Sequence, residues 1–196
     1  MQQKAALLRG AIAPDHDLLL AYNDELVGPG TALIAARAAF VVELAAAVRA
    51  VYGRWPGTSE RIDIAYAPNA GDLAAALAAN IDTEIRRKTA LVGPHRDDLH
   101  LTIDGRPLDA FGSQGQQRTA VLALKVAEYE TMRSRAGDAP ILLLDDVLSE
   151  LDAERAGGFL TAVGTFEQAF LTTTELPGRF AAAARYRIAA ATLAPC

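Results

Sequence analysis

The sequence predicts an α/β protein in which a mainly helical N-terminal arm precedes a parallel α/β layer. Three observations lead to this fold class. Apolar residues recur at helical spacing over Thr31–Tyr52, the charged run at 93–98 marks a change of character, and helical and strand patterns alternate after Phe111. We expect the arm to occupy residues 1–90, with a small strand-containing segment, and the α/β layer to occupy residues 91–196.

The arm is expected to contain two long helical segments. Large apolar residues at spacings of three, four and seven predict an amphipathic helix over Thr31–Tyr52. The segment Gln2–Val27 is also helical in pattern but is interrupted at Pro14. The Gly-Pro-Gly run at 28–30 is expected to end that first segment, because proline and glycine are poor helix formers. A helical hairpin or extended arm would result.

Further elements follow along the chain. Alternating apolar residues predict a strand over Ile62–Tyr66, and Asp72–Lys88 returns to a helical pattern. A second alternating segment, Leu99–Ile103, leads into Asp104-Gly105, which is a hairpin-type turn signal. We expect Leu108 to lie on the returning strand.

The α/β layer begins with a helix start and continues to a buried strand. Ser113 is placed to cap a helix that runs to about Arg135, with Gln116 completing a capping-box pattern. The apolar run Ile141–Leu144 is typical of a strand covered on both faces, and it ends in Asp145-Asp146. The helix, strand, helix, strand order that follows indicates a parallel sheet.

Composition narrows the function classes. The formal net charge of −5 argues against a protein that coats nucleic acid by bulk charge. The single cysteine is the last residue, Cys196, so disulfide frameworks and thiolate metal sites are excluded. No signal-peptide pattern opens the sequence, and the richest apolar stretch, residues 38–48, is short and contains Glu43. We therefore expect a cytoplasmic protein without membrane contact.

Each chemical motif has two interpretations when taken alone. An acidic pair after four apolar residues is more often a strand cap than a metal site, whereas a strand-end aspartate in an open α/β sheet suits Mg²⁺ beside a nucleotide phosphate. Ser113 and Gln116 are explained equally by simple capping or by a phosphate site at the helix start, with Gly115 permitting close backbone approach. Spacing alone does not choose between these interpretations.

The order of the motifs does choose. Ser-Gln-Gly-Gln-Gln at 113–117 opens a helix, an apolar strand ending in two aspartates follows, and Leu-Ser-Glu-Leu-Asp comes next at 148–152. This order resembles the signature motif, Walker B strand and D-loop of ABC-type ATPases. Within that superfamily, these motifs and Gly-Pro-His-Arg-Asp-Asp at 93–98 closely resemble the RecF family of DNA-repair ATPases. The resemblance is strong over residues 91–174 and fainter in the arm, and it implies the C-terminal half of an ABC-type (P-loop) ATPase head.

The resemblance implies roles for individual residues. Asp145 corresponds to the Walker B ligand of Mg²⁺, and Asp146 to the catalytic carboxylate that positions the attacking water. Because aspartate is one methylene shorter than the glutamate of relatives with robust turnover, a slow, switch-like ATPase is expected. The cofactor-binding residues implied for ATP are Ser113, Gln114, Gly115, Gln116, Ser149, Asp152 and Thr174.

The family also implies a biological role. Its members are expected to form ATP-dependent homodimers that bind DNA at gaps and single-strand to double-strand junctions. They are expected to act with RecR and RecO to help load RecA, in recombinational repair and the SOS response. In the family, ATP is held between the Walker motifs of one subunit and the signature motif of the other.

A phosphate-binding Walker A loop is missing from the sequence. That loop requires Gly-Lys-Ser/Thr, and none of the three lysines, Lys4, Lys88 and Lys125, stands in that context. We therefore expect a C-terminal portion of the family fold, inactive as an ATPase by itself, with apolar surface exposed around Ile141–Leu144. The alternative is a non-catalytic DNA- or protein-interaction module that keeps the ABC fold. A nucleotide-binding subunit of a membrane transporter would share the Walker B and signature motifs, but the helical arm and the residues of the motifs at 113–117 and 148–152 fit it poorly.

Overall fold

The computed structural model describes residues 2–10, 15–148, 151–175, 184–189 and 191–195. The chain forms two compact units, one of Met1–Ala46 with Asp63–Thr102 and the other of Ala47–Ile62 with Ile103–Cys196. This division differs from the expected boundary at residue 90. One reason is that the loop after the arm helix packs within the second unit, where Trp55 meets Phe159 edge to face at 6.0 Å.

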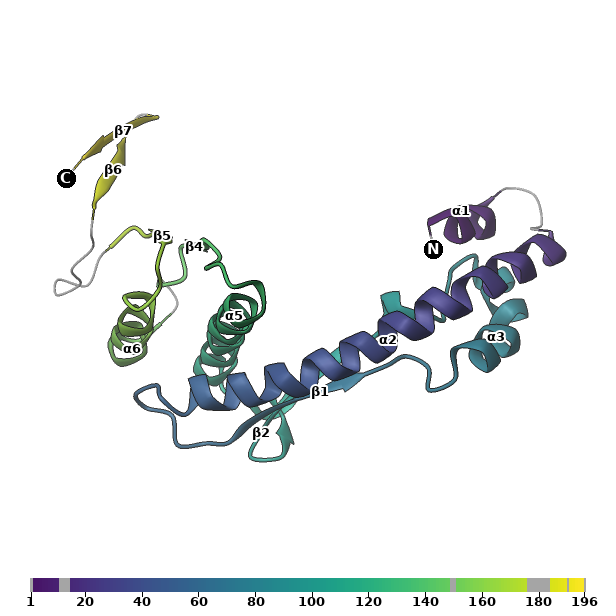
Figure 1. Ribbon diagram of the computed structural model, residues 1–196, viewed down its shortest axis with the longest axis horizontal. Helices are drawn as coiled ribbons and strands as arrows, with labels where there is room; N and C mark the ends of the chain where they lie inside the picture. The colour runs from purple at the N-terminus through teal and green to yellow at the C-terminus, as the bar shows by residue number, and fades with distance from the viewer. Residues whose placement is uncertain (1, 11–14, 149–150, 176–183, 190, 196) are drawn as a thin grey trace. The chain divides into compact units, whose positions relative to one another are not determined.

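Two helices begin the chain, α1 over Gln2–Arg9 and α2 over His16–Tyr52 (Figure 1). The helix α2 is continuous through residues 28–30, so the predicted break there is wrong. A proline removes one backbone hydrogen bond and fixes a φ angle that a helix already uses, which a 37-residue helix can accommodate. Gly30 has a packing role instead, because a Cβ atom there would lie 2.5 Å from Leu73 Cδ2.

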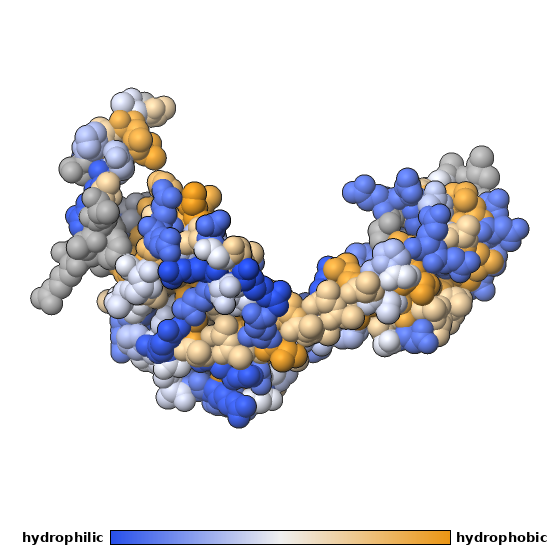
Figure 2. Space-filling model, in the orientation of Figure 1, coloured by the Kyte–Doolittle hydropathy of each residue, from blue (hydrophilic) through white to orange (hydrophobic). Residues whose placement is uncertain are grey.

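The helix α2 also exposes apolar surface along part of its length (Figure 2). Val42 of this helix is 74% exposed. Within the residues that the structure describes, it is the one helix long and apolar enough to cross a membrane by length and composition. Core helices of soluble proteins meet the same criterion. The expectation of no membrane contact therefore stays a prediction.

The first unit is built around α3, which covers Leu73–Arg87 and confirms the predicted helix. Asp72 caps its start by accepting a hydrogen bond from Ala75 N at 3.0 Å, and Lys88 ends it in a left-handed conformation. The apolar face of α3 packs with residues of α2 and of the segments just before and after α3. The members of this cluster are Leu26, Val27, Ile34, Ala70, Leu73, Ala76, Leu77, Leu91 and Val92.

A buried ion pair joins α1 to α3. Lys4 Nζ lies 2.6 Å from Glu84 Oε2, and both side chains are fully buried. The other carboxylate oxygen of Glu84 accepts hydrogen bonds from Leu91 N at 2.7 Å and Val92 N at 3.2 Å. Glu84 therefore fixes both α1 and the segment that leads into the 93–98 run.

A three-stranded sheet has the order β1-β2-β3, with β1 over Ile62–Ala67, β2 over Asp98–Ile103 and β3 over Arg106–Pro107. Asp104 and Gly105 both have positive φ angles, 48° and 76°, as the predicted hairpin turn requires. The returning strand is shorter than expected, because Leu108 begins the four-residue helix α4, Leu108–Phe111, and not the strand. Proline at 107 cannot donate to a strand ladder, which explains the early end of β3.

The second unit contains the predicted α/β layer. Its elements are α5 over Gln114–Ala136, β4 over Leu142–Asp145, α6 over Ala153–Val163 and β5 over Ala169–Thr172. The strands β4 and β5 pair in parallel, with Leu143 opposite Phe170, which confirms the predicted parallel arrangement. A second pair, β6 over Tyr186–Ala189 and β7 over Thr192–Pro195, is antiparallel and exposed.

The β4–β5 sheet is covered on one face only within the described chain. Leu144 is buried, but Ile141, Leu143 and Phe170 are 58%, 74% and 55% exposed. The expectation of a strand covered on both faces is thus wrong for this chain. The expectation of exposed apolar surface here is confirmed for Ile141 and Leu143, and it is wrong for Leu144.

Candidate functional site

The carboxyl end of β4 carries the two acidic residues on which the sequence interpretation depends. Parallel pairing brings the carboxyl ends of β4 and β5 to the same edge, so Asp145 lies opposite Thr172. The Thr172 hydroxyl donates a hydrogen bond to Asp145 Oδ1 at 2.5 Å. One oxygen of the Asp145 carboxylate is thereby fixed by the neighbouring strand.

Asp146 leaves the strand with a positive φ angle of 48°. Its backbone N–H donates to both the carbonyl oxygen of Thr172, at 3.1 Å, and the Thr172 hydroxyl, at 3.0 Å. Asp is one of the few residues that adopt a left-handed conformation at modest cost. Thr172 therefore holds both aspartates, whereas Thr174 lies two residues past the end of β5. A nucleotide-sensing role for Thr174 stays a prediction.

The oxygen donors at this edge fit a magnesium ion in one respect. Asp145 offers a carboxylate that points from a strand end, and Mg²⁺ is commonly bound through one or two carboxylates plus phosphates and water. No group of three or more His, Cys, Asp or Glu side chains suited to a metal occurs in the described part of the chain. The donor set thus fits an ion that a nucleotide phosphate helps to hold, and does not form an all-protein cage.

The start of α5 has the capping box that the sequence predicts. Ser113 Oγ accepts from Gln116 N at 3.2 Å, and Gln116 Oε1 accepts from Ser113 N at 2.8 Å. The Gln116 side chain also donates through Nε2 to Glu60 Oε1 at 2.5 Å. Gln114 is the first residue of the helix. Backbone N–H groups in the first turn of a helix have no partner within the helix, which makes this end suitable for an anion.

Glu60 is held in its charged form at this helix start. The hydrogen bond from Gln116 is the largest effect that lowers the pKa of Glu60, and the positive charge of Arg155 adds to it. Glu60 lies just before β1, 56 residues from Gln116. No local sequence pattern points to it, because its partner is distant along the chain.

Gly115 is in close contact with Arg155 of α6. A Cβ atom at residue 115 would lie 2.2 Å from Arg155 Nη1, so a glycine is required for the guanidinium to occupy this place. Arg155 Nη1 also contacts Asp152 Oδ2 at 3.0 Å. The second, independently predicted site residue, Asp152, is thus linked to Gly115 through a single side chain.

Asp152 is the N-cap of α6. Its Oδ1 accepts from Arg155 N at 2.9 Å, and this backbone hydrogen bond is the main reason that the pKa of Asp152 is lowered. Tyr52 is the last residue of α2, and the charges of Glu60 and Arg155 are close enough to affect its pKa. Burial, with the negative charge of Glu60 next, raises the pKa of Tyr52 to about 12. It is a neutral phenol that packs beside the charged groups.

Sequence reasoning missed Arg155, Glu60 and Tyr52. Arg155 had one available signal, an acidic residue three positions earlier at the start of an apolar helix. Ser149, which was expected to contact ATP, lies outside the described residues. Apart from Thr174, which follows β5, the remaining predicted residues fall into two groups within the second unit. The first group is Asp145 and Asp146 at the end of β4, and the second is Ser113, Gln114, Gly115, Gln116 and Asp152 at the starts of α5 and α6.

The Gly-Pro-His-Arg-Asp-Asp run in the first unit forms a hydrogen-bonded junction. The Asp97 side chain, 3% exposed, accepts hydrogen bonds from Arg37 Nη1 at 3.0 Å, from Asn69 N at 2.9 Å and from the Tyr66 hydroxyl. Burial alone would raise the pKa of Asp97, but these hydrogen bonds and the charge of Arg37 outweigh it and lower the pKa.

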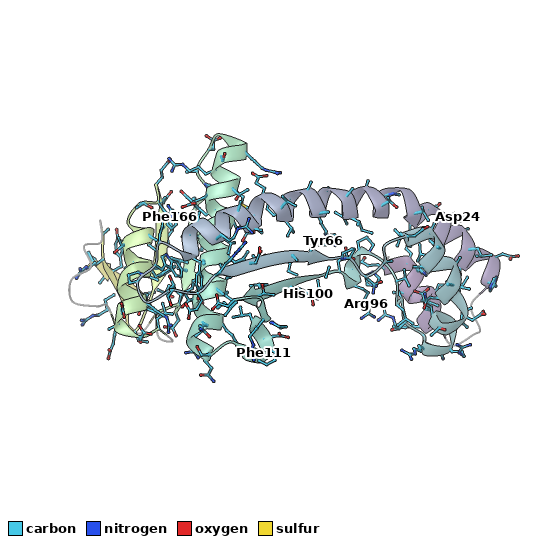
Figure 3. The ribbon with its side chains drawn as sticks, turned by 90° about the horizontal axis from the view of Figure 1, so that it is seen from below. Asp24, Tyr66, Arg96, His100, Phe111 and Phe166 are labelled. Carbon is cyan, nitrogen blue, oxygen red and sulfur yellow. The ribbon has the colours of Figure 1, made fainter. Side chains whose placement is uncertain are left out.

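His95 and Arg96 belong to the same junction, and Figure 3 labels Tyr66 and Arg96 on it. The Arg96 guanidinium donates to Ala90 O at 2.9 Å and 3.2 Å, and His95 Nε2 lies 3.3 Å from the same oxygen. These contacts give His95 and Arg96 a hydrogen-bonded structural role.

Comparison with known proteins gives one consistent result. No family model matches the chain. The chain is 43% identical over 194 residues to the DNA replication and repair protein RecF of Chloroflexus aurantiacus, covering 89% of this chain and 50% of that protein. It is 39% identical over 189 residues to the RecF protein of Thermosynechococcus vestitus, covering 90% and 50%. The chain therefore spans about half the length of the curated relatives that it matches.

Solved structures agree. A structure of the recombination mediator protein RecF-ATP in the RecFOR pathway matches with a TM-score of 0.80 and 26% identity, over 100% of this chain and 55% of that one. A second, of RecF-ATPrS in the same pathway, matches with a TM-score of 0.81 and 26% identity, over 99% and 55%. Both the sequence and the fold are thus similar to about half of a RecF protein.

Proposed function

We propose that this chain, which is homologous to the C-terminal part of RecF proteins, supplies the signature, Walker B and D-loop share of a RecF-like clamp in DNA replication and repair. The observation that carries the proposal is the joint placement of Asp145 and Thr172 at the carboxyl edge of a parallel strand pair. An edge of this kind is where α/β proteins bind phosphate ligands and their metal ions. ATP and Mg²⁺ are the ligands proposed.

The first group of residues would act on nucleotide held in the same subunit. Asp145 would bind Mg²⁺ beside the ATP phosphates, with the Thr172 hydroxyl holding its other oxygen in place. The ion would neutralise charge that develops on the phosphates during transfer. Asp146 would position the attacking water. Its short side chain supports slow hydrolysis, which suits a switch more than a rapid ATPase.

The second group would act on nucleotide held by another copy of the protein. Ser113, Gln114, Gly115 and Gln116 form the first turn of α5, where backbone N–H groups favour an anion such as the γ-phosphate. Asp152, with Ser149, would complete the contact at the same interface. Thr174, which follows β5, would sense the γ-phosphate. ATP would then close a homodimer, and hydrolysis would open it.

The clamp would act on DNA in the cytoplasm. The substrates proposed are DNA gaps and single-strand to double-strand junctions, and the protein partners are RecR and RecO, which would help to load RecA in recombinational repair and the SOS response. The net charge of −5 means that any DNA contact would be local. A non-catalytic interaction module is the second candidate, favoured by the missing Gly-Lys-Ser/Thr motif.

The test is ATP binding and hydrolysis with Mg²⁺. The chain would be assayed alone and mixed with the N-terminal half of the Chloroflexus aurantiacus RecF protein, which is expected to carry the Walker A loop. We expect activity in the mixture only, lost on Asp146→Ala and on Asp145→Asn. The matched control is Asp138→Ala, an exposed aspartate in the loop before β4. If the mixture neither binds nor hydrolyses ATP, the interaction module is the better description.

A further inference from the structure

Two hydrogen-bonded pairs lie at the starts of α5 and α6, and no sequence motif predicts either of them. Glu60 before β1 pairs with Gln116 in the first turn of α5, and Arg155 of α6 pairs with Asp152 at the start of α6. The close approach of Arg155 to Gly115 connects the two helix starts. We propose that Arg155 is a positioning residue that couples the D-loop end of α6 to the signature end of α5. This proposal rests on the proposed function, since it assigns both helix starts to one nucleotide.

The first step of the argument is steric. Gly115 leaves the space in which Arg155 Nη1 lies, and a Cβ atom there would be 2.2 Å from that nitrogen. Real Cβ contacts are never this short, so side chain and guanidinium cannot share the space. The glycine is therefore explained by an internal contact as well as by any approach of a phosphate.

The second step is the anchoring of Arg155. The side chain is 23% exposed, and Nη1 is held by Asp152 Oδ2 at 3.0 Å. The same aspartate caps α6 through Arg155 N at 2.9 Å. Residue 155 is thus tied to residue 152 at both its backbone and its guanidinium, so a shift of the D-loop end must move the cation that lies over Gly115.

The third step is the charge on the α5 side. Glu60 accepts from Gln116 Nε2 at 2.5 Å and is close enough to Arg155 for the guanidinium to stabilise its charged form. Gln116 in turn closes the capping box with Ser113. A cation at a helix N-terminus is unfavourable by itself, because that end of the helix dipole is positive. The negative charges of Glu60 and Asp152 offset this cost, and Asp152 holds the guanidinium directly.

The consequence is mechanical coupling between two candidate γ-phosphate contacts. A phosphate that draws the first turn of α5 toward itself would displace the guanidinium over Gly115, and through it Asp152. The reverse also holds, since a two-state coupling acts equally in both directions.

The first experiment uses the chain alone and needs no nucleotide. Hydrogen exchange would be followed at the amides of Gln116, which donates to Ser113 Oγ, and of Ala156, which donates to Asp152 O. In Arg155→Ala we expect about tenfold faster exchange at both amides. The matched control is Arg133→Ala, which removes an exposed ion pair with Glu167 in the same unit and should change neither amide.

The coupling is overturned if only the Ala156 amide exchanges faster in Arg155→Ala, because Arg155 then stabilises its own helix alone. If every amide of the unit exchanges faster, the substitution loosens the fold generally, and Arg155→Lys then decides. Lysine can reach Asp152 but lacks the planar group that lies over Gly115, so coupling predicts faster exchange at Gln116 with Ala156 little changed. An unchanged Gln116 amide in this variant also overturns the proposal.

The second experiment uses the complemented ATPase mixture described above. Arg155→Ala should lower kcat about tenfold while the Kd for ATP stays within a factor of two, because the Walker motifs hold the nucleotide and Arg155 acts only on the signature side. A comparable rise in the Kd for ATP, or an unchanged kcat, would contradict a positioning role. A wild-type mixture without activity would count against the proposed function, and the exchange result would still decide the coupling.

Discussion

The Thr172 hydroxyl donates a hydrogen bond to the Asp145 carboxylate across the parallel pair β4–β5. The same hydroxyl accepts a hydrogen bond from Asp146 N. One side chain therefore sets the orientation of the first acidic residue and the backbone path of the second.

Replacing Thr172 with valine keeps the branched shape and removes the hydroxyl. We expect ATP hydrolysis by the complemented mixture to fall about tenfold, because hydrogen bonds to charged groups are among the stronger ones. Thr172→Ser should retain most of the activity. The control is Thr173→Val, since the Thr173 hydroxyl donates to Glu175 O and not to either aspartate. Full activity in Thr172→Val would show that Asp145 needs no such support.

Asp97→Asn should destabilise the first unit by about 2–3 kcal/mol at neutral pH, because a nearly buried carboxylate loses its charge beside Arg37. Urea unfolding measures this. The folded-state pKa of Asp97 is lowered from 3.8, so its stabilising contribution is present above that value and is lost as pH falls through the lower folded pKa. The stability difference between wild type and variant should be constant above about pH 5 and shrink in stronger acid. A difference that grows in acid would contradict this assignment.

Two glycines of α2 form a matched pair. A Cβ atom at Gly28 meets nothing within 4 Å, whereas one at Gly30 would meet Leu73 Cδ2 at 2.5 Å. Gly28→Ala should stabilise the protein by about 0.5–1 kcal/mol through helix propensity. Gly30→Ala should be less stable than Gly28→Ala by about 1 kcal/mol or more, because Leu73 must move. Equal thermal unfolding midpoints for the two variants would show that α3 does not pack closely on Gly30.

The buried pair of Lys4 and Glu84 offers a test of charge compensation. Lys4→Met should cost about 3–5 kcal/mol, because it leaves the Glu84 carboxylate buried without its counter-ion. The double variant Lys4→Met, Glu84→Gln should recover a large part of that loss, since an amide oxygen can still accept from Leu91 N and Val92 N. Chemical unfolding of the two variants checks this, and a double variant no more stable than the single one would contradict it.

Local signals allowed much of the second unit to be predicted. The capping box at Ser113 and the hairpin turn at Asp104-Gly105 each depend on residues only a few positions apart. Hydrogen bonds between residues this close along the chain can be predicted from the local sequence pattern. The parallel order of β4 and β5 followed from the alternation of helix and strand patterns.

The errors occurred where distant contacts decide. The Gly-Pro-Gly run at 28–30 was expected to end a helix. Gly30 instead lies within α2 and leaves space for the side chain of Leu73, which is 43 residues further along the chain. Glu60 was missed because its partner Gln116 lies on another element, and Arg155 was missed because its contact with Gly115 joins two elements. The junction at Asp97 also depends on distant residues, through Arg37 of α2, Tyr66 of β1 and Asn69 in the loop after β1. Single-sequence periodicity carries no information about such meetings.

The hairpin turn after β2 has a practical consequence for engineering. Exposed turns are usually the best places for a fluorophore or an inserted peptide. At this turn, however, Asp104 N donates to Arg61 O at 2.9 Å and Asp104 Oδ1 accepts from Arg61 N at 2.8 Å. The turn is therefore hydrogen-bonded to Arg61, the residue after Glu60. A reporter inserted at this turn would disturb Glu60 and, through it, the start of α5.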